Sequence, residues 1–169
     1  ARASDVIRRA FSHRYVKGDP PGAWQIVRVL EDRSVSLGVL KPVYYWITAR
    51  SDTLLYDFVT DFLSGQSRSP DLHIRIDDVA GWITGRLRLS RQNWTPTVTF
   101  KVGRGLLAAL RDFGILEGTS RKRLAPVYLP IESFTYIAFL LHQLGTSSST
   151  LVNHPDWKLF LLPPSLVEK

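Results

Sequence analysis

A long amphipathic segment between residues 95 and 114 is the feature of the sequence that most limits its fold. Thr95 followed by Pro96 is a typical helix start, and Gly114 is a typical helix stop. Between these signals, the residues separate into two faces at helical spacing. One face is apolar and contains Phe100, Gly103, Leu106, Leu107, Leu110 and Phe113. The opposite face contains Thr97, Lys101, Arg104, Ala108 and Arg111. The segment therefore predicts a helix that ends near Phe113 and has one buried and one exposed face.

Helical spacing of apolar residues continues through most of the chain. It predicts further helices over residues 4–15, 23–30, 35–50, 52–63, 77–87 and 132–144. In the third of these, Pro42 is interpreted as the first residue of a restarted helix, because its fixed φ suits a first turn. Residues 147–150 read as a polar linker, and His154 with Pro155 and Asp156 as a capped turn. The fold class is therefore mainly α.

A short β-hairpin is expected after the long helix. Residues 115–117 and 124–129 read as two short strands that flank a basic tip at residues 118–123. Helix, basic turn, longer helix and hairpin is the order of a winged helix-turn-helix. We therefore expect one compact helical domain over residues 1–169 with a winged helix-turn-helix-like segment. The loop at residues 65–70 is the best candidate boundary between two sub-lobes, 1–65 and 71–169.

The net charge is concentrated in one part of the chain. The formal net charge is +7, and residues 86–123 carry nine basic and two acidic groups. The remaining residues carry 13 of each sign. A concentrated positive charge indicates a surface that meets a polyanion. The alternative is that these side chains only solvate exposed faces.

The winged-helix interpretation gives each basic group a position on DNA. The second helix of such a motif enters the major groove, and the turn and wing contact phosphates. On this basis the candidate nucleic-acid-binding residues are Arg88, Arg91, Gln92 and Asn93 near the turn, Thr95, Thr97, Lys101, Arg104 and Arg111 on the helix, and Arg121, Lys122 and Arg123 at the wing. Arg8 and Arg9 in a second basic cluster at the start of the chain are added to this set.

The sequence offers little that could support catalysis. It has no cysteine, which excludes disulfides, iron–sulfur clusters and thiol nucleophiles. The four histidines are scattered, and no metal-ligand spacing is present. Gly103, Gly105 and Ala108 match a loose dinucleotide fingerprint, but no acidic residue follows at the required distance. We expect these glycines to let another helix approach closely, and we expect no enzyme activity, no metal and no small-molecule cofactor.

The apolar runs are too short to cross a membrane. The most apolar one, residues 134–141, is far below the about 20 residues that a bilayer requires. The first residues contain neither a methionine nor a hydrophobic secretory core, which suggests a trimmed chain rather than a signal peptide. We therefore expect a cytoplasmic protein without membrane contact.

Four segments together resemble one family. They are residues 41–46 (KPVYYW), 54–59 (LLYDFV), 103–114 (GRGLLAALRDFG) and 154–160 (HPDWKLF), and they resemble BrxA, a small accessory protein of bacteriophage exclusion (BREX) defence systems. The resemblance implies a cytoplasmic, mostly helical protein with a fold similar to NusB. It further implies DNA binding, action beside a defence methyltransferase and other BREX components, and no established catalytic activity. It provides no motif-defined binding residues, and it implies that family members extend beyond Lys169.

Three functions follow from these observations. The first is a non-catalytic component that binds double-stranded DNA through the basic helix and wing. The second is a protein-interaction scaffold, in which the acidic face with Asp57 and Asp61 and exposed Tyr44, Tyr45 or Trp46 dock partner subunits. The third is an RNA-binding protein of NusB type, although few aromatic residues are interleaved with the basic groups.

Overall fold

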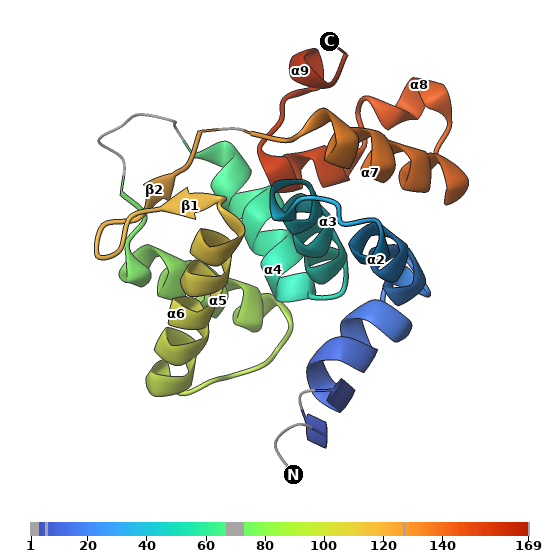
Figure 1. Cartoon of the computed structure of the whole chain (residues 1–169). Helices are drawn as coiled ribbons and strands as arrows, with labels where there is room; N and C mark the ends of the chain where they lie inside the picture. The colour runs from blue at the N-terminus through green and yellow to red at the C-terminus, as the bar shows by residue number, and fades with distance from the viewer. Residues whose placement is uncertain (1–3, 6, 67–72, 127, 169) are drawn as a thin grey trace. The chain divides into compact units, whose positions relative to one another are not determined.

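The computed structural model describes residues 4–5, 7–66, 73–126 and 128–168, and these are mainly helical (Figure 1). The prediction of a mainly α fold with a short hairpin is confirmed. The chain forms two compact units, residues 1–64 with 128–169, and residues 65–127. Residues 128–169 thus belong with the N-terminal part of the chain, whereas the sequence analysis assigned them to a sub-lobe 71–169.

The first unit is built around one apolar helix, α3 (Leu37–Arg50). Apolar residues lie on all sides of this helix, and seven of its fourteen residues are buried, which is typical of a central helix. The helix packs against α2 (Ala23–Asp32), α4 (Thr53–Asp57) and α7 (Ile131–Gln143). The other elements of this unit are η1 (Ile7–Val16), η2 (Phe58–Phe62), η3 (Leu63–Gly65), α8 (Ser148–Leu151), η4 (Pro155–Phe160) and α9 (Pro164–Val167).

Three expectations for this unit are wrong. Pro42 does not restart a helix, because α3 begins at Leu37 and continues through it, with buried Leu40 and Val43 on either side. Tyr45 and Trp46 are buried rather than exposed, because α3 lies at the centre of the unit. The linker at residues 147–150 contains a one-turn helix, α8.

A buried carboxylate joins segments of the first unit that are far apart in the sequence. Asp156, which is 1% exposed, accepts hydrogen bonds from the Trp46 indole N–H at 2.7 Å and from the Tyr56 hydroxyl at 2.9 Å. It also forms an ion pair with Arg50 at 2.6 Å. His154 caps the turn that carries Asp156, since its Nδ1 accepts from the Asp156 N–H at 3.2 Å. The predicted capped turn is therefore confirmed, and it brings η4 against α3 and α4.

Replacing this carboxylate is expected to destabilise the protein. Asp156→Asn leaves the half-buried Arg50 guanidinium with Asp19 as its other acidic partner, so we expect the free energy of unfolding to fall by about 3 kcal/mol. Asp32→Asn makes the same chemical change at an exposed pair with Arg28, where we expect a change below about 0.5 kcal/mol. Urea unfolding followed by circular dichroism measures both. Equal effects of the two substitutions would contradict the structural role of Asp156.

The second unit consists of two packed helices and a hairpin. α5 (Ile76–Leu89) and α6 (Pro96–Phe113) lie side by side, and β1 (Leu116–Glu117) pairs with β2 (Arg123–Leu124) in an antiparallel arrangement (Figure 1). Both predicted ends of α6 are confirmed. The Thr95 hydroxyl accepts from the Val98 N–H, and Gly114 ends the helix with a φ of 84°.

A glycine sets the close packing of α5 and α6. A Cβ atom at Gly103 would lie 3.0 Å from Ile76 Cδ1 and 3.3 Å from Val79 Cγ1 on α5. Nothing lies within 4 Å of a Cβ atom at Gly105, which faces outward. The expectation of a close helix approach therefore holds for Gly103 and not for Gly105. Both glycines lie inside α6, so no strand precedes them and the dinucleotide fingerprint is accidental.

These two glycines provide a matched test of the helix packing. Leucine at either position gains the same helix propensity. Gly103→Leu forces its side chain against Ile76 and Val79, whereas Gly105→Leu has open space. We expect Gly103→Leu to be less stable than Gly105→Leu by about 1–3 kcal/mol in urea unfolding. Equal stability of the two variants would show that the helices do not pack closely at Gly103.

Candidate nucleic-acid interface

The turn between α5 and α6 carries a group of exposed polar side chains. It closes through a hydrogen bond from the Gln92 N–H to the Leu87 carbonyl at 2.9 Å, and Arg91 adopts a positive φ of 53°. The candidate residues Arg88, Arg91, Gln92 and Asn93 are all exposed here. The turn therefore presents two cations and two amides to solvent.

The outward face of α6 extends this polar surface. Thr97, Lys101 and Arg104 are exposed, and neither Lys101 nor Arg104 forms an ion pair or a hydrogen bond with another described residue. Arg111 near the end of the helix is different, because it binds Asp112 through two hydrogen bonds at 2.8 and 3.1 Å. Positive charge on α6 is thus unneutralised along its first two thirds and partly neutralised at its end.

The hairpin uses some of its basic groups for its own structure. Arg123 lies opposite Glu117 across the two strands and forms an ion pair with it at 2.6 Å. The Lys122 ammonium donates to the Thr119 carbonyl at 2.8 Å, which leaves two of its protons available. Arg121 is exposed and forms no ion pair within the described residues. Arg121 is therefore the most available cation of the tip, and Arg123 the least.

A short extended segment before α5 joins the hairpin. Ile74 forms an antiparallel bridge with Lys122, in which the Ile74 N–H donates to the Lys122 carbonyl at 2.7 Å. Ile74 itself is buried. This contact places residues 73–75 beside the tip of the hairpin, 48 positions further along the chain.

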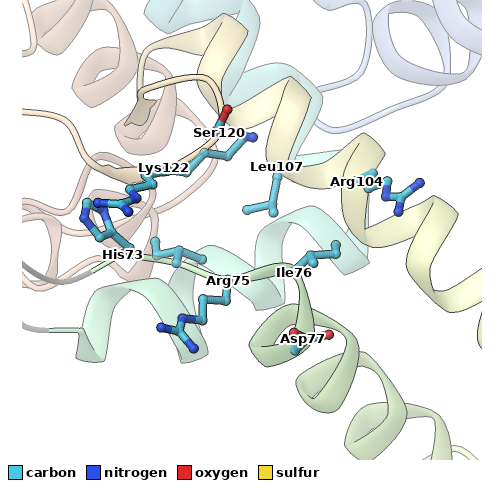
Figure 2. Close-up of a pocket in the computed structure, with 10 residues that line it drawn as sticks. His73, Arg75, Ile76, Asp77, Arg104, Leu107, Ser120 and Lys122 are labelled. Carbon is cyan, nitrogen blue, oxygen red and sulfur yellow. The ribbon is translucent and has the colours of Figure 1, made fainter.

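A cleft of about 640 Å³ opens where this segment, α6 and the hairpin meet (Figure 2). We name it the basic cleft, because four cationic side chains line it: Arg75, Arg104, Arg121 and Lys122. Among the described residues that line it, Asp77 is the one carboxylate, and His73 and Ser120 add further polar groups. Ile74, Ile76 and Leu107 form its apolar part, and Figure 2 shows Leu107 between Lys122 and Arg104.

The candidate residues from the sequence do not include Arg75 and His73, which both line the basic cleft. Arg75 and His73 precede the basic window of residues 86–123, and nothing local in their sequence marks them. The buried Nδ1 atom of His73 has no hydrogen-bond partner among the described residues. Only pairing between residue 74 and the hairpin tip reveals their position, and this pairing spans too many residues to be read from periodicity.

The N-terminal arginines lie in the other unit. Arg8 is exposed on η1 and forms an ion pair with Asp5 at 3.0 Å. The side chain of Arg9 lies outside the described residues. The structure therefore groups the predicted residues of the turn, α6 and the hairpin in one unit, and Arg8 and Arg9 do not belong to it.

The described part of the chain shows neither a metal cluster nor a membrane-spanning helix. Its His, Asp and Glu side chains form no group of three or more that could hold a metal ion. None of its helices has the length and apolar character needed to cross a bilayer.

Comparison with known proteins identifies the family. The family model of BrxA matches residues 23–140, which is most of the chain. This range contains three of the four segments that resemble the family and also the whole α5, α6 and hairpin region. Neither a curated protein nor a solved structure matches the chain. The chain therefore belongs to the BrxA family and is a component of a BREX phage defence system.

Proposed function

We propose that this BrxA-family protein is a non-catalytic accessory component that binds double-stranded DNA. One observation carries the proposal. The second unit has exposed cations that have no acidic partners among the described residues, and these cations lie on the turn, on α6 and at the hairpin tip. Phosphate neutralisation by such groups releases counterions and drives binding that is largely independent of sequence. Family membership supports a role in phage defence, with the BREX methyltransferase among the partners.

The dimensions of α6 suit the major groove. Its 18 residues extend over about 27 Å, and an α-helix fits the groove. In this arrangement, Thr97 and Lys101 face base edges, while Arg88 and Arg91 contact phosphates beside the groove. The bridge between Ile74 and Lys122 supports the winged-helix interpretation, because it ties a further extended segment to the proposed wing. We also include in this proposal a fold similar to that of NusB.

A scaffold function has support in the first unit. Leu30, Ile131, Tyr136 and Phe139 line an apolar groove of about 530 Å³, and Ile131 is 69% exposed. This groove replaces the buried Tyr45 and Trp46 as the candidate docking surface for another BREX subunit. DNA binding and docking use different units, so both functions are compatible.

A salt series with a charge-neutralised variant tests the DNA-binding function. The variant replaces the turn and helix cations outside the basic cleft: Arg88→Ala, Arg91→Ala and Lys101→Ala. We expect weaker binding to duplex DNA, and a slope of log affinity against log salt reduced by about one for each lost phosphate contact, up to about three. Fluorescence anisotropy with a labelled duplex measures both quantities.

The control variant removes three exposed basic residues from the first unit: Arg28→Ala, Arg33→Ala and Lys158→Ala. It has the same net charge as the test variant and is expected to keep the wild-type slope. An equal loss in both variants would mean that only net charge matters. A preference of the wild-type chain for single-stranded RNA would favour the NusB-type alternative.

A further inference from the structure

We propose that the basic cleft is a binding site for a single phosphate group presented by DNA. This inference rests on the proposed function and names the chemical group that one part of the surface recognises. The cleft differs from the rest of the basic surface, because its cations come from three separate segments and surround a cavity of about 640 Å³.

The cations of the basic cleft lack acidic partners among the described residues. Arg75, Arg104 and Arg121 form no ion pair with described residues, and Lys122 has two ammonium protons available. Asp77 does not neutralise them, because no described cation pairs with it. It lies in the first turn of α5, where a carboxylate stabilises the helix dipole. An anion in the cleft would relieve the repulsion among the four cations.

The shape and donors of the cleft favour phosphate over a carboxylate. The cations approach from the segment before α5, from α6 and from the hairpin, and a tetrahedral phosphate has oxygens directed toward several sides. The two oxygens of a carboxylate lie in one plane, whereas the diester phosphate of DNA carries two anionic and two ester oxygens in a tetrahedral arrangement. Guanidinium groups bind phosphate through paired hydrogen bonds, and the Ser120 hydroxyl is a further donor.

The apolar part of the cleft strengthens these interactions. Ile74 and Leu107 are 7% and 4% exposed, so the apolar part of the cleft includes buried side chains. Low-dielectric walls concentrate the field of the charges within a cleft. The hydrogen bond from Ile74 to the Lys122 carbonyl at 2.7 Å holds two of the three segments together before any ligand binds. The backbone positions of Arg75, Arg121 and Lys122 are therefore set without the anion.

Titration of the full ¹⁵N-labelled chain with inorganic phosphate tests the site directly. At constant ionic strength, with chloride as the compensating anion, we expect saturable shifts of the backbone amides at residues 73–77 and 120–122. No saturable shift, or shifts confined to other residues, would overturn the proposal. This measurement uses the wild-type chain, so it does not depend on the folding of any variant.

A double variant then connects the site to DNA. Arg75→Ala with Arg121→Ala removes two cleft cations, and we expect at least about tenfold weaker binding of phosphate. The matched control, Arg28→Ala with Arg33→Ala, removes two exposed arginines of the first unit and is expected to bind phosphate as the wild type does. Equal phosphate affinity of the two variants would contradict the site.

Duplexes with and without 5′-phosphates identify the source of the phosphate group. If the cleft binds a strand end, the phosphorylated duplex binds more tightly and this difference disappears in the cleft variant. If it binds an internal phosphate, both duplexes bind equally and both lose affinity in the variant. Unchanged duplex affinity in the cleft variant would overturn the proposal and leave the DNA-binding function intact. Saturable phosphate shifts in a chain that binds no duplex would instead support the anion site and overturn the DNA-binding function.

Discussion

The close contact of α5 and α6 at Gly103 is the constraint on which the second unit depends. Ile76, which would meet a side chain at residue 103, also lines the basic cleft. Leu107 lies one helical turn beyond Gly103 and lines the cleft as well. The same side chains therefore form the contact between the helices and the apolar part of the cleft. A change in helix packing would move the cations of α6 relative to Arg75, so stability and charge geometry are coupled in this unit.

The acidic residues of the chain explain where positive charge remains unneutralised. Several carboxylates have structural roles: Asp52 caps α4, Asp78 binds the backbone at the start of α5, and Asp156 joins α3, α4 and η4. Between Gly85 and Ser120 only two acidic residues occur, and Asp112 and Glu117 pair with Arg111 and Arg123. The other basic groups of this region thus have few acidic neighbours. Their mutual repulsion destabilises the unit in isolation, and bound phosphates would remove this cost.

The helices could be predicted from the sequence because their signals are local. α6 has a cap, a proline, a stop glycine and two distinct faces within about twenty residues, and each of these features matches the structure. The tertiary contacts were not predictable in this way. Trp46 meets Asp156 across 110 positions, and the Tyr45 hydroxyl donates to the Leu159 carbonyl across 114. Burial of both side chains therefore involves contacts outside their own segment. The same reason explains why Arg75 was missed. The pairing of Arg123 with Glu117 is local, but it depends on the register of the hairpin, which the strand pattern alone does not give.

Separation of phosphate contacts from base contacts determines what selectivity the proposed interface can have. In the proposed arrangement, a cleft cation that binds a phosphate group cannot also contact a base edge. Arg88 and Arg91 likewise contact the phosphates of the DNA backbone. Discrimination between sequences then depends on the groups that can donate and accept hydrogen bonds in the groove, which are Gln92, Asn93 and Thr97, together with Lys101. Bidentate contacts from arginine to guanine are the commonest specific contacts in DNA recognition. Because the arginines of this surface contact phosphates in this arrangement, the proposed interface favours firm positioning on DNA with modest sequence preference.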